Sequence, residues 1–200
     1  MSTTRKALGA VAAFGISIGT MAAPAVAAPR PPNVHPYLLR LSEMPSGWSV
    51  TPGNFDSSGG PAPACAGHTV LTKPGASAGV GYDNGTDALL ETLGSWPTAS
   101  AAHHWFTVAS RALGRCHQFS MGGQTATFVP LNLGSYGNAS VAFKMNLTDQ
   151  GNGYDLALMI AQKGRVVAVL GYIVQDWAFD STAQDTISPM FQQAMAQVRP

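Results

Sequence analysis

The strongest pattern in the sequence is an amphipathic one between Pro97 and Cys116. Apolar side chains recur there at the i, i+3, i+4, i+7 spacing that puts them on one face of an α-helix. That face consists of Trp105, Val108, Ala109, Ala112, Leu113 and Cys116. Pro97 suits the first turn of a helix, where the amide hydrogen that it lacks has no partner in any case. The pattern predicts a helix over 97–116 that ends in a buried thiol.

After this helix the apolar period changes from 3.6 to 2, which is typical of strands. We expect strands over 125–131, 140–148, 154–161 and 166–174. The alternation is clearest in 140–148, where Phe143 and Met145 point one way and Lys144 the other. The stretch 166–174 is apolar on both sides, so it belongs in the centre of the sheet. Residues 162–165 provide the hairpin turn before it.

The remaining elements are shorter or less regular. We expect one or two helical turns over 37–43, strands over 48–51 and 76–82, a loop over 52–63, and a short helix from Thr86 to Leu93. A closing helix follows from the apolar stripe Ile187, Met190, Phe191, Ala194, Met195 and Val198. Because Pro189 interrupts this run, the helix either starts near Ser181 and kinks or starts at Ser188. The predicted fold class is α+β, a twisted antiparallel sheet with helices packed on one face and one disulfide.

The first 27 residues have the order of a secretory signal peptide. Arg5 and Lys6 precede an apolar run over 7–21, and Ala25-Val26-Ala27 offers small residues at the cleavage positions. The apolar run is shorter than the roughly 20 residues that a bilayer span needs. We therefore expect cleavage after Ala27, no transmembrane anchor and, without a cysteine near the cleavage point, no lipid attachment. The domain organisation is a signal peptide over 1–27, a flexible proline-rich leader over 28–36 and one domain over 37–200.

Charge adds little to this picture. Without Arg5 and Lys6, nine basic residues stand against the ten acidic ones, and charged residues make up 10% of the chain. This near balance predicts no nucleic-acid partner and no anionic membrane as partner.

The two cysteines, Cys65 and Cys116, suggest a disulfide in an oxidising compartment. The bond would close a loop of about 50 residues and stabilise the fold by roughly 4 kcal/mol. The alternative is a zinc site of Cys65, His68, Cys116 and His117, but the secretory route and the unusual spacing favour the disulfide. No metal and no cofactor is expected.

A possible nucleophile is Ser77, in the G-x-S-x-G sequence over 75–79. A nucleophile elbow needs a strand before the serine and a helix after it, whereas here a loop precedes and a strand follows. Asp83 or Asp87 followed by His103 would supply a triad in the right chain order. A secreted serine hydrolase is therefore the alternative rather than the first hypothesis. His104, Arg111 and Arg115 form a basic flank on the predicted helix, which we interpret as a solvated face.

Several segments in order resemble the extracellular sensor domain of actinobacterial PknH-type kinases and its stand-alone secreted or lipoprotein relatives. They are the turn 41–48 (LSEMPSGW), the helix ending in Cys116, the link 130–137 (PLNLGSYG), and the closing hairpin and helix. The resemblance covers roughly Tyr37 to Val198. It implies an antiparallel α+β domain with a disulfide and a cleft for an unidentified ligand. Sensor domains of this type often hold two disulfides, whereas only Cys65 and Cys116 occur here.

The first hypothesis is therefore a secreted, non-enzymatic, sensor-like domain at or outside the cell envelope. Its partner would be an unidentified small molecule or envelope component, held in a cleft between sheet and helices. The alternatives are the serine hydrolase that uses Ser77 and a structural envelope protein without a ligand. The sequence does not identify ligand-binding residues.

Overall fold

One antiparallel sheet dominates the computed structural model of the protein, which describes residues 29–53, 72–116, 118–121, 124–149, 152–175 and 181–199. In this part of the chain eight strands follow one another in the order β1-β2-β3-β8-β7-β6-β5-β4. Their bounds are β1 Ser49–Val50, β2 Ala76–Asp83, β3 Asp87–Ser95, β4 Gln118–Met121, β5 Gln124–Leu131, β6 Ala139–Asp149, β7 Asn152–Lys163 and β8 Val166–Gln175. The predicted antiparallel sheet is confirmed, with β8 in its interior between β3 and β7.

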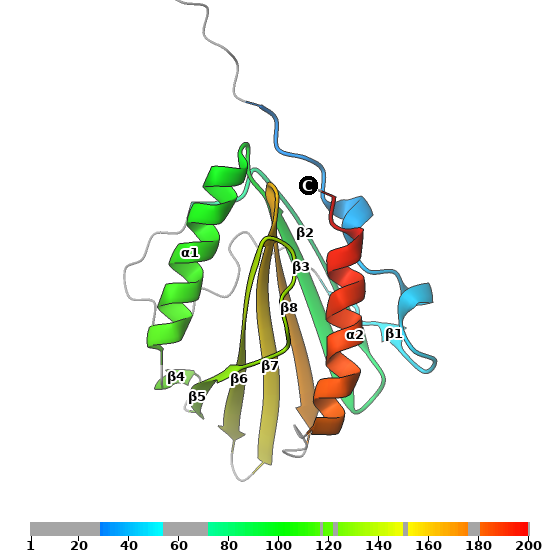
Figure 1. Cartoon of the computed structure of the whole chain (residues 1–200). Coiled ribbons are helices and arrows are strands. Elements are labelled where there is room, and N and C mark those ends of the chain that lie inside the picture. Colours follow the sequence, from blue (N-terminus) through cyan, green and yellow to red (C-terminus); the bar gives the residue numbers. More distant parts are fainter. Residues whose placement is uncertain are drawn as a thin grey trace, which may run out of the picture.

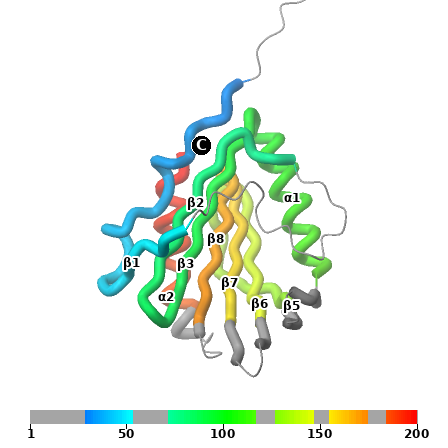
Figure 2. The backbone as a smooth tube through the Cα atoms, turned by 180° about the vertical axis from the view of Figure 1, so that it is seen from behind, coloured from blue at the N-terminus to red at the C-terminus, as the bar shows by residue number. Residues whose placement is uncertain are grey.

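The two helices lie on opposite faces of this sheet, which corrects the prediction that helices pack on one face. Helix α2 (Ser181–Gln197) lies in front of the strands in Figure 1 and behind them in Figure 2. Its core cluster includes Ala157 and Met159 of β7, whereas Leu158 and Ile160 belong to the cluster of α1 (Ala99–Arg115). Successive side chains of a strand point to opposite faces, so strands that are apolar on both sides require a cover on each.

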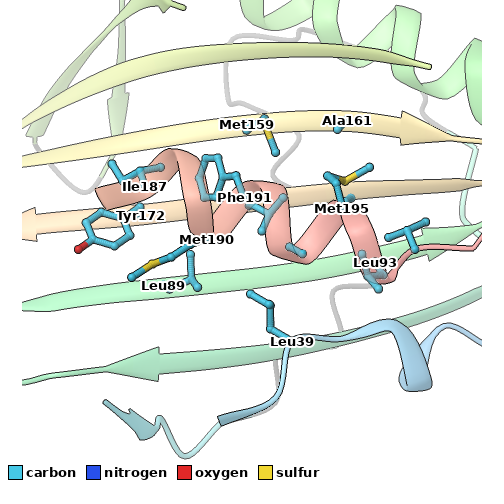
Figure 3. Packing of buried hydrophobic residues seen from close by; sticks show 14 of the residues in the cluster. Leu39, Leu89, Leu93, Met159, Ala161, Tyr172, Ile187, Met190, Phe191 and Met195 are labelled. Atoms are coloured by element: carbon cyan, nitrogen blue, oxygen red, sulfur yellow. The ribbon is translucent and has the colours of Figure 1, made fainter. Parts of the chain in front are cut away.

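The larger core lies under α2 (Figure 3). Phe191 and Ile187 are fully buried there against Leu89 and Leu93 of β3 and Met159 of β7. All six positions of the predicted apolar stripe are buried, from Ile187 to Val198. The helix starts at Ser181 and contains Pro189, so the first of the two predicted starts is confirmed.

Helix α1 confirms the predicted amphipathic segment, with a later start. Thr98 is its N-cap and its side chain accepts a hydrogen bond from the backbone N–H of Ala101 at 3.1 Å. Pro97 therefore precedes the helix instead of lying in its first turn. The buried face carries Trp105, Ala109 and Leu113, as predicted.

The predicted helix from Thr86 to Leu93 is wrong, because this stretch is strand β3. Leu89, Glu91 and Leu93 alternate toward the α2 face and all have zero exposure. Pairing with β2 on one side and β8 on the other satisfies the backbone of β3 along its length. Tertiary pairing therefore overrides the helical preference of the Leu-Leu-Glu-Thr-Leu run.

The N-terminal segment packs along the edge of the α2 core. Of two 3₁₀ turns, η2 (Leu41–Glu43) lies within the stretch 37–43 where helical turns are expected, whereas η1 (His35–Tyr37) begins before it. Val34 has zero exposure, and the carbonyl of Pro32 accepts a hydrogen bond from Ser95 Oγ at 2.7 Å. This packing differs from the flexible leader expected over 28–36: its apolar valine finds space beside β2 and β3. The loop expected over 52–63 lies mostly outside the described residues.

The link between β5 and β6 packs against α2. Leu133 is buried in the α2 core, and Gln184 Nε2 donates to Asn132 O at 2.7 Å. Gly137 has a φ of 64°, and a Cβ there would lie 2.5 Å from the carbonyl oxygen of Gln162. The link therefore requires glycine where it passes β7, which gives a structural role to the segment 130–137.

Candidate functional site

A small recess opens between α1 and the sheet, on the face opposite α2. Its walls are apolar and aromatic with two hydroxyl groups, and its volume is about 20 Å³. The described residues that line it are Pro74, Ser77, Thr92, Leu93, Gly94, Trp96, Trp105, Val167 and Val169. A cavity needs about 10–15 Å³ of such volume to hold one water molecule, so this recess has room for one or two groups of that size. The recess can therefore receive a small group or one end of a larger ligand, but not a whole large molecule.

Two tryptophans form its inner wall. The rings of Trp96 and Trp105 are 5.4 Å apart between centroids and tilted by 43°. The backbone N–H of Trp96 donates to the carbonyl of Arg165 at 3.0 Å, which ties the end of β3 to the β7–β8 turn. A Cβ at Gly94 would lie 3.0 Å from Cη2 of Trp96, so the strand passes close to the ring. This part of the recess is thus rigidly built from β3 and the start of α1.

Trp96, which lines the recess, carries a buried polar atom without a partner. Its Nε1 has no hydrogen-bond acceptor among the described residues. A buried donor left unpaired costs about 1–3 kcal/mol, and a ligand that carries an acceptor would recover that energy. None of the described lining residues is titratable. The chemistry available here is therefore apolar contact and hydrogen bonding.

Ser77 lines this recess but does not form a nucleophile elbow. It is the second residue of β2 and pairs with Gly94 of β3. Asp83 lies at the far end of the same strand, about 20 Å away at the usual rise of a strand. His103 is exposed on α1, where its ring stacks on Phe106 at 6.3 Å. The triad considered from the sequence is not assembled, because its members lie on distant parts of the sheet and helix.

Of the two cysteines of the predicted disulfide, Cys116 alone lies among the described residues. Cys65 and His68 lie outside the described residues, as does His117, so the zinc alternative lies there as well. Cys116 is 2% exposed at the C-terminal end of α1, where its backbone N–H donates to Leu113 O at 3.0 Å. The disulfide therefore stays a prediction. Within the described part of the chain, no three His, Cys, Asp or Glu side chains gather as metal ligands would.

The basic flank of α1 is solvated, as interpreted from the sequence. His104, Arg111 and Arg115 are all exposed along the helix. They lie away from the tryptophan recess, which faces the sheet.

A buried polar centre on the α2 face was not predicted. Glu91 has zero exposure, its Oε2 accepts from the backbone N–H of Leu39 at 2.7 Å, and Oε1 has no partner among the described residues. Tyr82 Oη donates to the carbonyl of Leu39 at 2.6 Å, so both the N–H and the carbonyl of Leu39 are hydrogen-bonded to side chains of the sheet. Burial raises the pKa of Glu91 to about 7, the Leu39 hydrogen bond opposes the shift, and the charge of Glu43 adds to it. Burial also raises the pKa of Tyr82, with contributions from Glu91 and Glu43.

This centre could not be found from the sequence because the run that contains Glu91 was interpreted as a helix. In a helix, Glu91 could face water. In β3 its neighbours two positions away are both core leucines, and that alternation is the signal that was available.

A mixed fold of this kind, with an antiparallel sheet covered by one helix on each face, defines an α+β domain. None of the helices in the described part of the chain is long and apolar enough to cross a bilayer. The fold is similar to the crystal structure of the extracellular domain of PknH from Mycobacterium tuberculosis. The TM-score is 0.57 at 14% identity, over 81% of this chain and 94% of that one. No family model and no curated protein matches the sequence.

Proposed function

We propose that this protein is a secreted, non-enzymatic, sensor-like domain that binds a small molecule or envelope component in the tryptophan recess. The partner is a ligand with an apolar portion and a hydrogen-bond acceptor. The buried Nε1 of Trp96, which has no acceptor among the described residues, carries the proposal, because a polar group of this kind is normally satisfied in a folded protein. The fold shared with an extracellular domain supports the sensor-like assignment.

Two further features support binding over catalysis. The lining offers Ser77 and Thr92 as hydroxyl groups, and no acid or base among the described residues that could activate them. The walls come from β2, β3, β8 and α1, which are fixed by pairing and packing, so the recess is already formed without a ligand. Export and cleavage after Ala27 remain part of the proposal, since those residues lie outside the described part of the chain.

A thermal-shift screen of envelope lipids, glycans and small metabolites tests the proposal. We expect at least one compound to raise the melting temperature of the wild type at saturating concentration. Trp96→Phe keeps an aromatic ring but removes the N–H, so it should weaken that compound's binding by roughly tenfold, the value of one hydrogen bond. Trp48→Phe is the matched control, because Trp48 lies on the other face beside Tyr172, at 6.0 Å between ring centroids.

Three outcomes would contradict the proposal. They are a screen without any stabilising compound, equal affinity of Trp96→Phe and wild type, and an equal loss in the Trp48→Phe control. Labelling of Ser77 by a fluorophosphonate probe, lost in Ser77→Ala, would instead favour the hydrolase.

A further inference from the structure

The two described chain ends and the β7–β8 turn lie at the same end of the molecule (Figure 1), and six basic residues belong to or adjoin these segments. We call this the basic end. It consists of Arg30, Arg40, Lys73, Lys163, Arg165 and Arg199. Arg30, Arg40, Lys73 and Arg199 are exposed, and Lys163 and Arg165 are half-buried.

Hydrogen bonds at the top of β3 hold the first half of this set together. Trp96, just after β3, donates to the carbonyl of Arg165 at 3.0 Å. Ser95 Oγ donates to the carbonyl of Pro32 at 2.7 Å, and the Ser95 carbonyl accepts from Gly75 N at 2.8 Å. Arg30 and Lys73 each lie two residues from one of these bonded positions, so they share this end with Arg165.

Bonds at the end of α2 hold the second half. Lys163 Nζ donates to the carbonyl of Met195 at 3.1 Å. Gln197 Nε2 donates to Glu43 Oε2 at 2.6 Å, which brings η2 against the last turn of the helix. Arg199 and Arg40 line the same open groove of about 440 Å³ at this junction. Glu43 lines this groove as well. The groove is large enough for a phosphate-bearing headgroup, and an arginine side chain can bind phosphate through two parallel hydrogen bonds.

Negative charge is scarce at this end. Glu43 is its one exposed carboxylate among the described residues, and that carboxylate already accepts hydrogen bonds from Arg40 N and Gln197 Nε2. The carboxylate of Glu91, which accepts from the N–H of Leu39 beside Arg40, is fully buried. Asp83 and Asp87 flank the β2–β3 turn at the far end of the sheet, and Asp155 and Asp185 lie near the starts of β7 and α2. The described residues contain one ion pair, Lys144 with Asp155 at 2.8 Å, also toward that far end. The near-zero net charge thus conceals a strong separation of charge along the molecule.

We infer that the basic end docks the domain on an anionic phospholipid surface. Six cations against one exposed carboxylate on a single end form a charge pattern that is attracted to anionic headgroups. The path of the chain favours a membrane over a soluble polyanion. The described chain enters the fold at the basic end, and only residues 22–28 separate it from the apolar run 7–21. Until the expected cleavage after Ala27, at most about 30 Å of chain can separate the basic end from this apolar run.

Vesicle co-sedimentation of the full chain tests this inference. We expect stronger binding to phosphatidylcholine vesicles with 30% phosphatidylglycerol than to phosphatidylcholine alone, and a loss of that difference at 0.5 M salt. All variants are compared in the full chain, so the contribution of Arg5, Lys6 and residues 7–21 is the same in each. Lys73→Glu/Arg199→Glu should weaken the anionic preference at least tenfold.

The matched control is Arg111→Glu/Arg115→Glu, which changes net charge equally on exposed residues of the opposite half of α1. It should leave the preference within about twofold. An equal effect of both double variants would overturn the inference, as would equal binding to both vesicle types by the wild type. Binding to soluble polyphosphate or nucleic acid but not to anionic vesicles would overturn it too. Where a double variant does not fold, the single variants Lys73→Glu and Arg111→Glu make the same comparison.

Discussion

At the residue scale, the most unusual group is the carboxylate of Glu91, which is buried in the middle of a core strand. Its position holds the backbone of Leu39 and so fixes the N-terminal segment against β2 and β3. The groups that face it are Tyr82 from β2 and Glu43 from η2, while α2 presents apolar side chains. No cation of the described part of the chain pairs with it, so the charged form is unfavourable in the folded state.

This arrangement predicts a stability that falls as pH rises. The pKa of Glu91 is raised from 4.5 to about 7 in the folded state, so the folded protein binds the proton more tightly than the unfolded chain does. The corresponding stabilisation is complete below pH 4.5 and is lost as pH rises through 7. Its size is of the order of 3 kcal/mol. Glu91→Gln should remove this dependence and make the protein more stable than the wild type at pH 8.

Urea unfolding at pH 5 and pH 8 measures the effect. The control is Asp185→Asn, an exposed carboxylate in the first half of α2, which should leave the pH dependence unchanged. Parallel pH profiles of wild type and Glu91→Gln would show that Glu91 does not stay protonated in the folded protein.

At the element scale, segments with one clear apolar period were predicted correctly, and a segment whose apolar residues suit both a helix and a strand was not. The α1 stripe and the alternation in β6 were predicted correctly, because each pattern allows only one buried face. The run Leu89–Leu93 has leucines that suit either a helix or a strand, and only its pairing with β2 and β8 decides between them. The apolar character of β8 on both sides was recognised, but not its consequence, a helix on each face.

The position of α2 is the part of this architecture that a single substitution tests best. Phe191 has zero exposure between the helix and the sheet, so Phe191→Ala should destabilise the fold by about 3–5 kcal/mol. Gln192→Ala, the next and exposed residue, should change stability by no more than about 0.5 kcal/mol. Chemical unfolding of both variants gives the comparison. Similar losses for the two would mean that α2 does not pack on this face as described.

At the scale of the whole molecule, the net charge of the sequence did not indicate how the fold distributes charged residues. Net charge averages the ends of the molecule together, whereas folding collects residues as distant as Arg30 and Arg199 at one end. The tryptophan recess was equally invisible, since Ser77, Trp96 and Trp105 come together only through strand pairing and the turn at Thr98. The cysteine pair, in contrast, is a prediction from the sequence that the described residues leave open.

Cys116 makes that prediction testable through the stability of the whole fold. If Cys116 is joined to Cys65, Cys116→Ser releases a loop of about 50 residues and should lower the melting temperature in non-reducing buffer by roughly 10 °C. Burying a serine at this 2% exposed position has a cost of its own, so Cys65→Ser serves as the second single variant. The double variant should be no less stable than the weaker single one, because a bond can be lost only once. Additive losses, or two reactive thiols in the unfolded wild type without reductant, would show that the sulfur atoms are not joined.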